Sequence, residues 1–139
     1  MGKRVELCLL AALIALFALP VFAQAPLTVG IEKKLAIDSS GFSDVESVLT
    51  AQGLRWVIYD PEATYIAPHF EKFDLAPGDF LIVSDADGLQ NYSLTGRGKM
   101  EAGTFWSQHV KGDTAVLELV TRGQKLGKGF VVDSYAAGF

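Results

Sequence analysis

Short runs in which apolar and polar residues alternate, separated by turn residues, make up most of the chain after residue 53. The run 114–121 is the clearest, because Ala115, Leu117 and Leu119 all fall on one face of an extended strand. A period of two residues is typical of a β-strand with one buried face. We therefore expect this run to be a strand whose odd-numbered residues form part of a core.

Residues 64–73 follow the same rule, with Ile66 and Phe70 on one face and His69 and Glu71 on the other. Gly, Pro and Asp separate such runs at intervals of roughly ten residues, which is the spacing of strands in sandwiches and barrels. Further strands are predicted at 54–59, 80–84 and 130–135, one marked by Tyr92 and Leu94, and one that contains Phe105 and Trp106. The pattern predicts an all-β fold for residues 54–139, an antiparallel two-sheet sandwich or jelly roll.

The N-terminal part reads differently. Residues 1–23 have a basic start, an apolar run and then small residues typical of a signal-peptidase cleavage site. Cleavage is expected after Ala23, or alternatively after Ala25. The apolar run is shorter than the roughly 20 residues that span a bilayer, so we interpret it as a helical secretory signal peptide. Residues 24–53 form a strand and loop segment: the alternation at 31–37 predicts an edge strand, whereas 42–49 is ambiguous because its apolar residues have helical spacing.

Composition narrows the class of protein. The chain has 139 residues, 16 acidic and 12 basic side chains, and a single cysteine, Cys8, which lies inside the predicted signal peptide. A mature chain without cysteine has no disulfides, no thiol nucleophile and no zinc–thiolate site. An acidic balance without a basic cluster also argues against nucleic acid as a partner. We expect a secreted or periplasmic protein that does not associate with a membrane once the signal is removed.

Candidate catalytic residues are few. Serine catalysis needs a base close to the serine and a carboxylate that orients the base. The chain has two histidines, His69 within a predicted strand and His109 at the end of the strand that contains Trp106, and neither is near a serine motif. We interpret both as solvated or rim histidines on outer strand faces, and we assign no catalytic residue.

A metal site is the next possibility. Asp79, Asp85 and Asp87 flank one predicted strand, and their carboxylates could converge at one end of the sandwich to bind calcium. The spacing does not match a helix–loop–helix calcium motif, and turn aspartates more often accept backbone N–H bonds. We therefore assign no metal ligand and no cofactor.

Aromatic residues could form a sugar-stacking platform on an exposed face, or they could belong to the core. Because aromatic residues in strands are more often buried, we expect most of them in the core. The residues in question are Trp56, Tyr59, Tyr65, Tyr92, Phe105 and Trp106.

The chain also resembles a known kind of region between residues 56 and 139. The resemblance rests on the order and spacing of ATYIAPHF (63–70), FDLAPGDF (73–80), FWS (105–107), GDTAVLEL (112–119) and GFVVDSYAAGF (129–139). In these stretches it resembles the non-catalytic N-terminal β domain of secreted, chymotrypsin-like serine endopeptidases, including bacterial enzymes similar to lysyl endopeptidases. The segments around Phe70 and Tyr135 are also similar to CUB domains, which are secreted sandwiches.

The two resemblances imply different roles. The first implies an accessory or pro-region domain that packs against a trypsin-like protease domain, in the same chain or another, or against its substrate. The second implies a free-standing module that binds a protein or a glycan, in some cases through calcium. None of the protease family's triad motifs maps onto this sequence, so the resemblance implies no catalytic residue here. In that family the catalytic half would begin after Phe139. Two interpretations therefore stay open: the chain is a piece of a longer protease, or it is an independent accessory protein.

Overall fold

The computed structural model describes residues 27–40, 48–50, 53–122 and 127–139, with 48–50 described for the backbone only. The predicted signal peptide and most of the ambiguous segment 42–49 lie outside these residues. The strands are β1 (Gly30–Asp38), β2 (Val48–Thr50), β3 (Gly53–Tyr59), β4 (Tyr65–Asp74), β5 (Phe80–Ser84), β6 (Asn91–Leu94), β7 (Phe105–Trp106), β8 (Val110–Lys111), β9 (Thr114–Val120) and β10 (Gly129–Gly138). A three-residue 3₁₀ helix, η1 (Lys99–Glu101), precedes β7. Within the described ranges no helix combines the length and the apolar character needed to cross a membrane.

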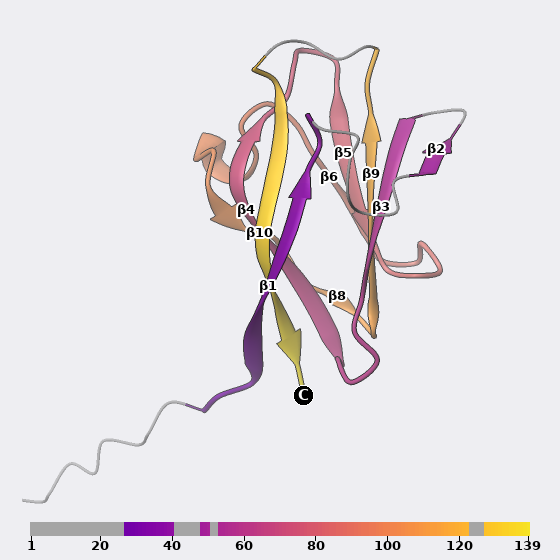
Figure 1. The fold of residues 1–139 in the computed structure, drawn as a ribbon, viewed down its shortest axis with the longest axis vertical. Helices are drawn as coiled ribbons and strands as arrows, with labels where there is room; N and C mark the ends of the chain where they lie inside the picture. The colour runs from indigo at the N-terminus through magenta and orange to yellow at the C-terminus, as the bar shows by residue number, and fades with distance from the viewer. Residues whose placement is uncertain (1–26, 41–47, 51–52, 123–126) are drawn as a thin grey trace, which may run out of the picture.

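Two antiparallel sheets form the fold (Figure 1). Sheet A has the order β1–β10–β4–β7, with β8 also paired to β4, and sheet B has the order β2–β3–β9–β5–β6. The expected edge strand at 31–37 is β1, which pairs with the last strand, β10. The prediction of an all-β, two-sheet sandwich is confirmed.

The core lies between the inner faces of the sheets. On β9 the predicted face of Ala115, Leu117 and Leu119 is buried, as the alternation indicated. Opposite it, sheet A contributes the fully buried Phe70 and Phe130. Their rings belong to an aromatic cluster, with mostly edge-to-face pairs, together with Trp56, Phe73 and Phe105. Such pairs add stabilisation beyond the burial of apolar area.

Pro68 divides the edge of sheet A next to β4. In an antiparallel strand the N–H and C=O of one residue point to the same neighbour. The Pro68 carbonyl accepts a hydrogen bond of 2.9 Å from the Ser107 N–H, so this side of Pro68 faces the segment after β7. Proline has no N–H to donate toward that segment. Pairing is interrupted there, and the edge is split into β7 and β8 with residues 107–109 between them.

A polar network ties β1 to the turn after β3. The buried Asp60 carboxylate accepts bonds from Lys33 Nζ at 2.5 Å and from the Tyr135 hydroxyl at 3.2 Å. The Lys33 ammonium is the main cause that holds the pKa of Asp60 below its ordinary value. Burial, reinforced by the neighbouring carboxylate, raises the pKa of Tyr135.

Replacing Asp60 by asparagine should lower the free energy of unfolding at pH 7 by roughly 1–2 kcal/mol, as expected when hydrogen bonds to a charged group are weakened. Because the pKa of Asp60 is lower in the folded chain, its stabilisation is fully present above the unfolded value of about 3.9 and is lost as the pH falls through the folded value. Urea unfolding at pH 7 and near pH 2 measures this, and the difference between the two proteins should shrink at the acidic pH. A difference independent of pH would contradict it.

Candidate functional site

One row of side chains crosses the outer face of sheet A. The strand register places Lys34 of β1 opposite Ser134 of β10, Ser134 opposite His69 of β4, and His69 opposite Trp106 of β7. Residues directly opposite each other on antiparallel strands project from the same face. The row therefore brings an imidazole, a hydroxyl and an indole together from three strands.

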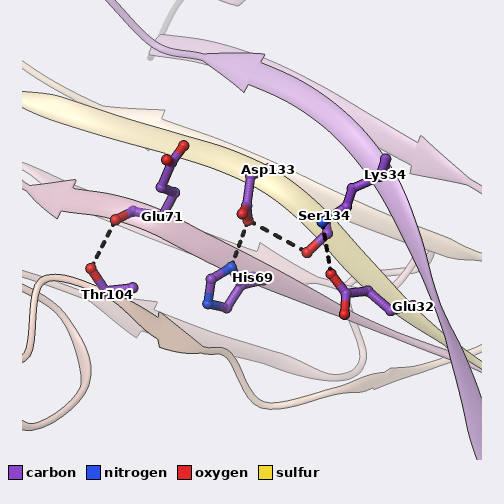
Figure 2. A network of polar contacts seen from close by, with 7 residues as sticks. All are labelled: Glu32, Lys34, His69, Glu71, Thr104, Asp133 and Ser134. Atoms are coloured by element: carbon purple, nitrogen blue, oxygen red, sulfur yellow. Dashed lines mark hydrogen bonds and ion pairs between the residues drawn. The ribbon is translucent and has the colours of Figure 1, made fainter.

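A bulge in β10 adds a carboxylate to this row. Val132 pairs with Phe70 and Ser134 with His69, so Asp133 is an extra residue without a partner on β4. Its Oδ1 lies 2.5 Å from His69 Nδ1 (Figure 2). Since an ionised carboxylate only accepts hydrogen bonds, Nδ1 carries a proton and donates it to Asp133, and Nε2 points away from this bond.

Trp106 covers the other side of His69. The two ring centroids are 4.7 Å apart and tilted by 47°. The histidine side chain is 19% exposed on the outer face of β4, which agrees with the rim histidine that was one of the two expectations, and Trp106 and Asp133 enclose the ring on two sides. Trp106 itself stays 40% exposed, which leaves an indole surface open to a ligand.

Ser134 completes a serine, a carboxylate and a histidine in one place, a combination that the sequence analysis did not anticipate. Figure 2 shows Asp133 between the other two, since Ser134 Oγ donates to Asp133 Oδ1 at 3.4 Å. In nucleophilic catalysis the histidine must lie between the serine and the carboxylate. Here the serine is fully buried and contacts the carboxylate, so His69 does not lie in the position of a base for Ser134.

The charges around the row are paired. The hydrogen bond from His69 holds the pKa of Asp133 below its ordinary value. The Lys34 ammonium, 3.1 Å from Glu32, is the main cause that lowers the pKa of Glu32, and the Ser134 hydroxyl adds to it. Both carboxylates are therefore ionised at neutral pH, and each has a basic partner.

A hollow of about 540 Å³ adjoins the row on the same face. Its lining residues are Val29, Tyr65, Ala67, Ser107, Gln108, His109 and Ala136. Ala67 and Ala136 are opposite each other on β4 and β10, so two small side chains face each other there. The detached segment 107–109 forms another part of the lining, which connects the hollow to the break at Pro68.

Tyr65 lies at the end of this hollow, flat on the sheet. Gly30 and Gly138 are cross-strand partners, and a side chain on either would overlap the tyrosine. The hydroxyl donates to the Val29 carbonyl at 3.3 Å, and the ring lies 5.2 Å from His109. His109 is exposed and belongs to the segment between β7 and β8, so its predicted place at the end of a strand with Trp106 is wrong.

The prediction that Asp79, Asp85 and Asp87 could converge is wrong. Asp79 precedes β5 and the other two follow it, and a five-residue strand spans about 17 Å. The Asp79 carboxylate accepts from Thr121 Oγ1 and the Arg122 N–H, while Asp85 accepts from the Gln90 N–H. The described residues contain no cluster of three or more potential metal ligands.

The aromatic residues divide between core and surface. Trp56 and Phe105 are buried as expected, whereas Trp106 and Tyr59 are exposed. The exposed Tyr59 lies on β3 of sheet B, not on sheet A.

A second, smaller hollow of about 270 Å³ lies between β6 and β7. It is bordered by Tyr92, whose hydroxyl donates to the Gln108 carbonyl at 2.6 Å. Burial raises the pKa of Tyr92 to about 12. This tyrosine therefore links the two sheets at their open edge.

Part of the chain is similar to a known secreted protein. The chain is 31% identical over 90 residues to the secreted RxLR effector protein 73 of Plasmopara viticola. The match covers 58% of this chain but 22% of the effector, so the chain corresponds to about a fifth of that relative. No protein-family model matches the chain, and no solved structure does.

Proposed function

We propose that this chain is a secreted binding module that holds a glycan on the outer face of sheet A. The observation that carries the proposal is the pairing of an open indole surface, Trp106, with a histidine that is held through Nδ1 by Asp133 and whose Nε2 has no partner among the described residues. A sugar ring presents an apolar C–H face and a hydroxyl edge. The aromatic ring matches the first, and His69 Nε2 can form a hydrogen bond with the second, because a hydroxyl both donates and accepts; such sites orient a ligand on an apolar surface with a few polar groups.

Pre-organisation supports the same conclusion. The Asp133 carboxylate fixes the orientation of the His69 ring, and Tyr65 is held by its hydroxyl bond and by the glycines beneath it. Side chains fixed before binding lose less conformational entropy when the ligand arrives. Secretion is supported by the signal-like residues 1–23 and by the name of the effector to which the chain is similar.

A glycan array followed by thermal unfolding tests this function, because a ligand that binds only the folded state raises its stability. We expect at least one uncharged glycan to bind and to raise the melting temperature, and Trp106→Ala to abolish both effects. Tyr59→Ala is the matched control, since it removes an exposed aromatic ring from the other sheet. Binding that is lost equally in both variants would contradict the assignment of the face.

An accessory role beside a serine endopeptidase is the second candidate, and the ordered resemblance over residues 56–139 favours it. The two proposals are compatible, since a glycan-binding face could direct a protease to its substrate. The encoding gene tests this role. A reading frame that continues past Phe139 into a protease domain with a Gly-Asp-Ser-Gly-Gly segment would support it, whereas a stop codon with no protease gene nearby would count against it.

A further inference from the structure

The outer face of sheet A carries two aromatic pairs, not one. Tyr65 lies 5.2 Å from His109, and His69 lies 4.7 Å from Trp106. Tyr65 and His69 are four residues apart on β4 and project from the same face, a separation of about 13 Å along an extended strand. That distance is longer than a single sugar ring.

Only small side chains of β4 and β10 lie between the two aromatic pairs, so the surface is hollowed there. Ala67 lies midway between Tyr65 and His69 on the same face of β4, and its cross-strand partner is Ala136. Both alanines line the hollow, together with the polar Ser107 and Gln108. A ligand can therefore run along β4 from one aromatic pair to the other without meeting a large side chain on β4 or β10.

The charges on this face favour an uncharged ligand. Glu32 is paired with Lys34, and Asp133 is hydrogen-bonded to His69, so the row holds no cluster of charges of one sign. Lys111, opposite Tyr65, and Glu71, two residues beyond His69, add one charge of each sign. A strongly ionic ligand such as a phosphate or a polyanion would find no concentrated complementary charge here.

We infer that the face binds one linear, uncharged oligosaccharide along β4, with one sugar ring on Tyr65 and His109 and another on Trp106 and His69. This inference rests on the proposed glycan-binding function and adds the length and direction of the ligand. Two linked rings on two separate platforms bind more tightly than one ring, because the second contact is intramolecular.

Calorimetric titration with β-1,4-linked oligomers of glucose and of N-acetylglucosamine, from disaccharide to hexasaccharide, tests the inference. We expect the affinity for one series to rise about tenfold or more between the disaccharide and the longer oligomers and then to level off. Trp106→Ala should weaken binding at all lengths that bind. Tyr65→Ala should remove the gain with length, so that long oligomers bind like the disaccharide.

Two further variants keep the test interpretable. Tyr65→Phe retains the ring over Gly30 and Gly138 and should preserve the dependence on length, which covers the case in which Tyr65→Ala is poorly folded. Tyr59→Ala, on the other sheet, should leave every affinity unchanged. Equal affinities for disaccharide and hexasaccharide would overturn the two-platform inference while leaving the glycan function intact. Absence of binding throughout both series, together with a negative glycan array, would overturn both.

Discussion

Replacing Phe70 by alanine is expected to lower the free energy of unfolding by about 3–5 kcal/mol, the range for truncating a fully buried phenylalanine. Phe70 has no exposed surface, and its ring lies within 5.1 to 5.7 Å of the rings of Phe73, Phe105 and Phe130. Truncation leaves a cavity that three large rings border, and these rings cannot all move inward without leaving their own contacts. A loss of this size is a large part of the stability of a domain this small.

The measurement is the midpoint of urea unfolding, with the slope of the transition as a check on two-state behaviour. Phe139→Ala serves as the control, because it removes the same side chain from a position that is 66% exposed. We expect that variant to change the free energy by no more than about 0.5 kcal/mol. Similar losses in both variants would mean that Phe70 does not lie at the centre of the core.

Replacing Gly138 by alanine is expected to have the second-largest effect, a loss of about 1–3 kcal/mol from overpacking. The new Cβ would overlap the ring of Tyr65, which lies directly over this residue. The ring would have to leave the sheet, so the variant should also lose the Tyr65 platform in the proposed binding face.

A double-mutant cycle separates this overlap from any effect of alanine on the strand itself. In a Tyr65→Ala background the space above Gly138 is free, and Gly138→Ala should cost little or nothing there. Urea unfolding of the four proteins gives the coupling energy, which we expect to be at least about 1 kcal/mol. A cost that is equal in both backgrounds would show that the glycine is required for another reason.

The strands themselves could be predicted because their signal is local. The alternation in 114–121 and in 64–73 reflects which face of each strand meets the core, and the structure buries those faces. The turn residues around Ala76 and Gly78 end one strand and begin the next in the predicted places. For the same reason the outer position of His69 could be predicted, because it is adjacent to the core residue Phe70 and neighbouring residues in a strand face opposite sides.

The partners of His69 could not be predicted in this way. Asp133 is 64 residues away in sequence, and it reaches the imidazole only through the bulge in β10. Trp106 reaches it through the pairing of β4 with β7. Pro68 within a strand pattern is a local sign that pairing stops on one side. It does not tell which strand lies on that side.

The aspartates that flank β5 show the converse case, in which residues close in sequence are kept apart by the structure. Asp79 and Asp85 are close in sequence, yet an extended strand keeps them apart, and each carboxylate is used by donors near its own end of β5. Proximity in sequence suggested a site that the geometry of a strand does not allow.

The amino-acid sequence alone thus determined that the described part of this protein is a two-sheet β-sandwich and which side of the strands at 64–73 and 114–121 is buried. It could do so because side-chain alternation depends only on neighbouring residues. Only the tertiary structure decided that His69, Trp106, Tyr65 and His109 share one face above Ala67 and Ala136. That arrangement depends on strand order, register and one bulge, which are fixed by packing between segments far apart in the chain.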